Sequence, residues 1–142
     1  MIAEAIEAMI VADVGITAQL ATYDFGGLAV EPAVFTIDPI PHDSALPAIV
    51  ITEQGGARWG TIDPRRGTQF AVGHVRVFDN KGRSRVLVRG IAQALWELLD
   101  LANLVVAGYN DVGTYADPPQ DLPDSDGFPG SLVIVSVRLL EV

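Results

Sequence analysis

The stretch that decides the fold class is Leu132–Leu140, which reads LVIVSVRLL. Side chains of a β-strand point to opposite faces in turn, so each face takes every second residue. Here one set is wholly apolar, whereas the other includes Ser136 and Arg138. The alternation predicts a strand in which Val133, Val135, Val137 and Leu139 share one face and the remaining residues share the other.

A second long strand with two unlike faces is predicted at Gln69–Phe78. Its small and β-branched face comprises Ala71, Gly73, Val75 and Val77, and its larger face comprises Phe70, Val72, His74, Arg76 and Phe78. Shorter β-rich stretches predict strands at Val30–Ile37 and Leu46–Thr52. Prolines at 39 and 41 end the first of these, because proline cannot donate to a ladder. A short strand is also predicted at Leu104–Tyr109.

Two stretches rich in glycine or proline are predicted to be long connections. Glu53–Thr68 contains four glycines and Pro64, and Asp111–Gly130 contains four prolines among acidic residues. Connections longer than about 12 residues are uncommon in compact domains and are often functional.

Two amphipathic helices are predicted from apolar residues spaced three and four apart. The first covers about residues 2–13. The second is capped by Ser84, and its apolar face comprises Leu87, Ile91, Ala94, Leu95, Leu98 and Ala102.

The charges of the second helix oppose the helix dipole. Arg83, Arg85 and Arg89 lie near its positive end, while Glu97 and Asp100 lie near its negative end. Each such mismatch costs on the order of 0.3–1 kcal/mol at an exposed site. We expect either salt or a neighbouring subunit to supply the compensating charge.

The element order is therefore helix, three strands, helix, and one or two strands. We predict an α+β fold, with a mainly antiparallel sheet of about four strands and two helices packed on one face. The length of 142 residues fits one domain, residues 1–142.

Composition excludes several classes of protein. Hydrophobic residues make up 49% of the chain and charged residues 19%, which excludes a disordered chain. Cysteine is absent, so the chain has no disulfide scaffold, thiolate metal site or cysteine nucleophile. The longest stretch without a charge, Gly127–Val137, falls short of the roughly 18 residues that a membrane span needs. Acidic residues at positions 4 and 7 stand where an export signal would carry basic ones.

The net charge of −9 hides a segregation along the chain. Residues 58–89 carry a net charge of +6, between an acidic N-terminal segment and an acidic C-terminal one. The overall acidity argues against nucleic-acid binding. The clustered bases are either a solvated surface or one side of a head-to-tail contact between copies. For the second case we predict a protein interface with two parts. The first, here called the basic band, comprises Arg58, Trp59, Arg65, Arg66, Arg76, Arg83, Arg85 and Arg89, and the second comprises Asp124 and Asp126. Trp59 has an alternative role in packing against the sheet.

No motif predicts catalysis or a bound cofactor or metal. His42 and His74 are the only histidines, and neither has a histidine partner four residues on. Asp124-Ser125-Asp126-Gly127 matches a fragment of a calcium loop that lacks the final glutamate. The glycine-rich stretch 55–60 has no P-loop lysine. We therefore expect a protein that is not an enzyme.

Residues 33–51, AVFTIDPIPHDSALPAIVI, resemble the tail terminator (tail completion) proteins of long-tailed phages, whose relatives occur in prophages and gene transfer agents. In that family a proline-rich turn and a Leu-Pro precede an apolar strand, as Leu46-Pro47 does here. The element order also matches over nearly the whole chain. The acidic, proline-rich stretch 111–130 is longer than the resemblance leads us to expect.

The resemblance implies a structural protein of the virion, assembled in the host cytoplasm. It implies a hexameric ring that caps the head-proximal end of the tail tube and stops its polymerisation. The implied partners are copies of the chain, the tube protein and a neck or head-completion protein, with DNA only passing through the lumen and no membrane contact. The alternatives are a neck or head-completion component and a small-molecule-binding α+β domain.

Overall fold

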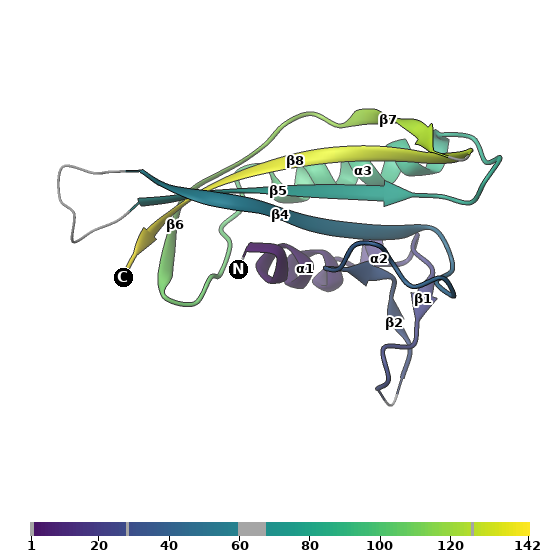
Figure 1. Cartoon of the computed structure of the whole chain (residues 1–142), viewed down its shortest axis with the longest axis horizontal. Coiled ribbons are helices and arrows are strands. Elements are labelled where there is room, and N and C mark those ends of the chain that lie inside the picture. Colours follow the sequence, from purple (N-terminus) through teal and green to yellow (C-terminus); the bar gives the residue numbers. More distant parts are fainter. Residues whose placement is uncertain (1, 28, 60–67, 126) are drawn as a thin grey trace.

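The computed structural model describes residues 2–27, 29–59, 68–125 and 127–142, which form a mixed α+β fold (Figure 1). The helices are α1 (Ile2–Ala12), α2 (Val14–Thr17) and α3 (Val86–Leu99). The strands are β1 (Thr22–Tyr23), β2 (Glu31–Pro32), β3 (Val34–Phe35), β4 (Ala48–Trp59), β5 (Thr68–Phe78), β6 (Tyr109–Ala116), β7 (Gln120–Ser125) and β8 (Phe128–Glu141).

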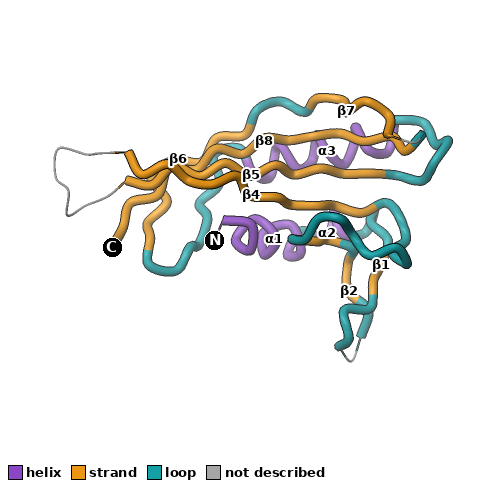
Figure 2. Tube along the Cα trace, viewed as in Figure 1, coloured by secondary structure: helices purple, strands orange, loops and turns teal. Residues whose placement is uncertain are grey.

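The main sheet has six strands in the order β3-β4-β5-β8-β6, and β7 also pairs with β8. All neighbours are antiparallel except β3 and β4, which are parallel. Strands β1 and β2 form a separate antiparallel pair. Figure 2 shows this pair standing away from the main sheet.

The core lies between the sheet and the two longer helices. The wholly apolar face of β8 lies in this core, because Val133, Val135, Val137 and Leu139 are all 0% exposed. They form one cluster with the apolar stripes of α1 and α3. At Gly73 on β5, a Cβ atom would lie 3.0 Å from the Cδ1 atom of Ile6, so the missing side chain lets α1 lie close against the sheet.

The second face of the main sheet is partly exposed along β5 and β8. At the β3 end it is covered by a smaller apolar cluster of Ala33, Phe35 and Ala48, with Tyr23 and Leu46 packed against it. The β1–β2 pair is therefore attached to the body of the molecule through its own small core.

The sheet has more strands than the four predicted, because two predicted connections are largely strand. Residues 53–59 continue β4 instead of leaving it, and β5 begins at Thr68. The pairing register shifts between Gln54 and Ala57, so the glycine pair 55–56 lies at a bulge within the strand. Residues 60–67 lie outside the described residues.

The prediction of a loop at 111–130 is also wrong. Strand β6 extends to Ala116, and β7 forms a hairpin with β8. Pro123 is tolerated in β7 because β7 is an edge strand, where a missing N–H donor interrupts no second ladder. The predicted strand at 104–109 is wrong as well, since only an isolated bridge joins Val106 and Tyr109.

The structure also corrects two sequence predictions that each concern only a few residues. The predicted strand at 30–37 is split into β2 and β3, which belong to different sheets. Helix α3 is shorter than predicted, and its N-cap is Arg85 instead of Ser84. No side chain forms a cap hydrogen bond at that position.

Candidate protein interface

The arginines of the basic band are positioned by three elements, and three of them contact their own chain. Arg76 lies on β5, and its Nη2 atom is 2.7 Å from an Asp38 carboxylate oxygen. The two side chains are 27% and 51% exposed. This ion pair joins the middle of the sheet to the turn after β3, so the Arg76 charge is partly neutralised within the chain.

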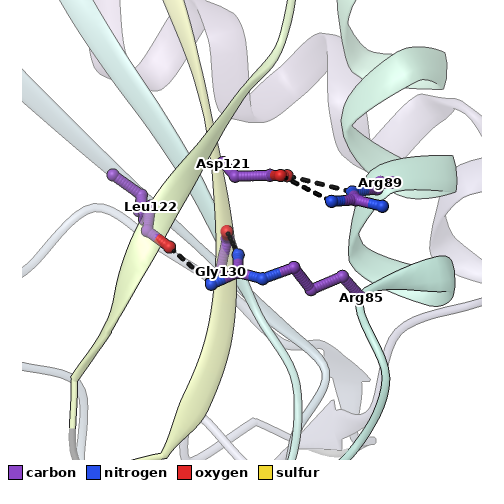
Figure 3. Close-up of polar contacts among 5 residues, drawn as sticks. All are labelled: Arg85, Arg89, Asp121, Leu122 and Gly130. Atoms are coloured by element: carbon purple, nitrogen blue, oxygen red, sulfur yellow. Dashed lines mark hydrogen bonds and ion pairs between the residues drawn. The ribbon is translucent and has the colours of Figure 1, made fainter.

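Arg85 and Arg89 lie one turn apart at the start of α3 and hold the β7–β8 hairpin (Figure 3). Arg85 donates hydrogen bonds to the carbonyl oxygens of Leu122, at 2.8 Å, and Gly130, at 3.0 Å. Arg89 donates two hydrogen bonds to the Asp121 carboxylate, at 2.7 and 3.1 Å. Such two-point contacts between a guanidinium and a carboxylate are geometrically specific.

The Arg89–Asp121 contact changes the acidity of both groups. The hydrogen bond to Asp121 raises the pKa of the Arg89 guanidinium, and the same bond lowers the pKa of the Asp121 carboxyl group. Both side chains are well exposed, at 60% and 42%, so solvent screens the pair.

These contacts correct the expectation for the charges of α3. We expected salt or a neighbouring subunit to compensate the arginines at the positive end of the helix. Asp121 and two backbone carbonyls of the same chain do so instead. The sequence did not reveal this partner, because Asp121 is 32 residues from Arg89 and lies in a stretch predicted to be a loop.

The basic band does not form one continuous surface. Arg58 on β4 pairs in register with Gln69, at the opposite end of β5 from the turn that carries Arg83. At about 3.4 Å per residue, β5 separates these two regions by roughly 30 Å. The structure describes only the backbone of Arg58 and Trp59 in β4 and of Asp124 in β7, and not their side chains. Arg65, Arg66 and Asp126 lie outside the described residues altogether.

Three shallow surface hollows surround α3. A hollow of about 410 Å³ lies beside the Arg89–Asp121 pair and is bordered by Pro118 and Pro119. A second, of about 390 Å³, lies between α2 and α3 near Glu97. A third, of about 420 Å³, lies at the start of α3.

Exposed apolar side chains cluster at the third hollow and on the β1–β2 pair. Val86 is 77% exposed and Leu87 is 36% exposed at the start of α3. Phe25 is 47% exposed and Val30 is 60% exposed in the connection between β1 and β2. The sequence predicted Leu87 on the apolar face of the helix and Val30 in a strand, and it gave no sign that either is exposed.

The residues that we considered for other chemistry lie apart from one another. His74 is half-buried on the second face of β5, opposite Thr52, and His42 is exposed in a turn. In the portion of the chain with assigned coordinates, no group of three or more His, Asp or Glu side chains is arranged to hold a metal ion. Trp96 is partly buried against the core, and its indole N–H donates to the carbonyl oxygen of Ala116 at 3.0 Å.

Comparison with known proteins identifies the fold. No protein-family model matches the chain, and no curated protein matches it in sequence. Among the described residues, no helix is long and apolar enough to cross a membrane. A chain of the solved virion of a native gene transfer agent particle superimposes with a TM-score of 0.67 over 97% of this chain and 93% of that one. The two sequences are 14% identical, so this chain shares its fold with a component of a phage-like virion.

Proposed function

We propose that the chain is a structural protein of a phage-like particle, in which residues 1–142 form a single tail-terminator domain. The observation that carries this proposal is the likeness to a gene transfer agent virion component over almost the full length of both chains. The resemblance of residues 33–51 to tail terminators supports the finer role. That role is a ring, hexameric as in that family, at the head-proximal end of the tail tube.

Two open edges of the main sheet support self-assembly. Among the described strands, β3 is the one that pairs with this edge of β4, at Ile49 and Val50, while the other edge of β4 pairs with β5. At the opposite edge, β6 and β7 each pair only with β8 within the described ranges. Unpaired strand edges readily pair with another chain, and a head-to-tail contact of this kind closes into a ring when the rotation permits.

The side chains at the far ends of the sheet are the remaining interface candidates from the sequence. Arg58 and Trp59 lie at the end of β4, with Arg65 and Arg66 next along the chain. Asp124 and Asp126 belong to the β7–β8 connection. Arg76, Arg85 and Arg89 already have partners within the chain, so we assign them a supporting role in the fold.

The oligomeric state and the effect on tube growth test this proposal. Light scattering coupled to size exclusion should detect a closed oligomer, and electron microscopy should show a ring. Added to polymerising tube protein, the chain should shorten the tubes, whereas the Arg65→Glu/Arg66→Glu variant should do so less and melt at the same temperature. A chain that stays monomeric, with or without the tube protein, and leaves tube length unchanged would contradict the proposal.

Pull-down assays separate the tail role from a neck or head-completion role. Retention on assembled tube protein supports the tail terminator assignment. Retention on portal protein instead would move the chain to the neck of the same particle.

A further inference from the structure

Strands β1 and β2 and the described residues between them (24–27, 29 and 30), here called the arm, form an acidic and apolar projection. Phe25 and Val30 expose 47% and 60% of their surface on it. Asp24 and Glu31 are exposed beside them, and residues 21–32 contain no lysine or arginine. In Figure 1 the arm projects below β4, whereas α3 lies behind β5 and β8.

The base of the arm is firmly held, so its exposed residues keep a fixed direction. The Ala33 N–H donates to the carbonyl oxygen of Ala21 at 2.8 Å, and the Ala21 N–H donates to that of Pro47 at 2.9 Å. The ring of Tyr23 packs edge-on against Phe25 at 4.9 Å and against Phe35 at 5.3 Å between centroids. Presenting a preorganised arm to a partner requires little further ordering.

The start of α3 has the complementary character. Its N-cap, Arg85, forms no side-chain cap, so the helix offers N–H groups and the positive end of its dipole. Lys81 and Arg83 are exposed next to it. Asp79, which also borders the hollow there, is 4% exposed, and its carboxylate accepts a hydrogen bond from the Asn80 N–H at 2.7 Å.

The hollow at this helix start has room for an apolar side chain. It measures about 420 Å³ and is bordered by Leu87, Gly90 and Arg83. A Cβ atom at Gly90 would meet nothing within 4 Å, so the floor of the hollow is open. Val86 stands at its rim and is 77% exposed.

We propose that the arm of one copy docks on the start of α3 of a second copy. Phe25 and Val30 then cover Val86 and Leu87, while the carboxylates of the arm face the uncapped helix end and Arg83. Apolar burial and charge complementarity act together at such a contact. The arm and the hollow consist of different residues, so repetition of this contact around a rotation axis closes a ring. The inference rests on the proposed self-assembly, because it identifies the two surfaces through which the copies bind one another.

Cross-linking between copies tests the contact, because the chain contains no cysteine. Val30→Cys protein and Val86→Cys protein are prepared separately, mixed, and treated with a short bismaleimide. The matched control replaces Val86→Cys with Val105→Cys, which lies beyond the far end of α3 and is 88% exposed. We expect a cross-linked pair in the first mixture and none in the control.

Charge exchange provides a second, independent readout. Glu31→Lys alone and Arg83→Glu alone should each weaken self-association about tenfold or more, and the double variant should recover it. Both side chains are exposed, so the melting temperature of each variant should match that of the unaltered chain.

The possible outcomes separate this contact from the ring itself. An oligomer of unaltered size that neither cross-links at these positions nor responds to the charge reversals overturns the docking contact and leaves the ring proposal standing. A chain that stays monomeric at every concentration and salt tested, both alone and with the tube protein, and that leaves tube length unchanged overturns both.

Discussion

Replacing Asp111 should destabilise the protein strongly, although the residue lies in a stretch that reads as a loop. Its carboxylate accepts hydrogen bonds from the N–H groups of Leu104, at 2.8 Å, and Gly113, at 2.9 Å, and from the hydroxyl group of Thr114. Leu104 and Thr114 are 3% and 2% exposed, so water cannot replace the lost acceptor without a rearrangement. The carboxylate thereby ties the segment after α3 to the start of β6.

The size of the effect follows from these three contacts. A hydrogen bond to a charged group contributes about 1.5–3 kcal/mol, and a buried donor left without a partner costs about 1–3 kcal/mol. Because the three bonds share one carboxylate and relax together, we expect Asp111→Ala to lower the free energy of unfolding by about 3–5 kcal/mol. That is a large part of the roughly 5–15 kcal/mol available to a domain.

Urea denaturation followed by circular dichroism measures this loss. The urea concentration at the midpoint should fall, while the dependence of the free energy of unfolding on urea concentration stays unchanged. Asp117→Ala is the matched control, because it removes the same charge from an exposed position six residues away. The control should change the free energy of unfolding by no more than about 0.5 kcal/mol. If Asp111→Ala is as stable as Asp117→Ala, the carboxylate does not hold the α3–β6 junction and the reasoning fails.

Three further predictions concern single residues. Leu101 has a φ of 60° and is 74% exposed, so Leu101→Gly should raise the free energy of unfolding by about 0.5–1 kcal/mol in urea titrations, whereas Leu101→Ala should not. The contact with Arg89 lowers the pKa of Asp121, so it stabilises the fold above the usual carboxyl value of 3.8 and is lost as the pH falls below it. Asp121→Asn should therefore melt below the unaltered chain at pH 7 and level with it in strong acid. Burial, and then the nearby carboxylates of Glu4 and Glu31, raise the pKa of Glu7, so its ionised form is disfavoured in the fold. Glu7→Gln should melt higher at pH 7, and the gain should vanish on titration to well below pH 4.5, since the glutamate is then protonated in both states.

Predictions from local periodicity held where the pattern was long. The helix at the N-terminus and the strands at 69–78 and 132–140 are present as predicted, because alternation and helical spacing depend only on near neighbours. Predictions from glycine and proline content failed at 53–59 and 120–125. There the ladder with a neighbouring strand outweighs a low intrinsic preference for strand.

The candidate interface was less accessible from the sequence than the fold. The clustering of arginines between residues 58 and 89 is visible in one dimension, but their partners are not. Arg76 pairs with a residue 38 positions away, and Arg85 binds a carbonyl 45 positions away. Contacts at such separations depend on the sheet order, which no local pattern encodes.

The amino-acid sequence by itself therefore determined the α+β class, which residues share a face of β5 and of β8, and the absence of cysteine chemistry, since these follow from residue type and short-range spacing. The tertiary structure alone decided that the α3 arginines are held within the chain, that α3 begins without a side-chain cap, and that an acidic apolar arm projects from the sheet. The physical reason is that exposure and ion pairing are set by what lies nearby in space after the strands have paired.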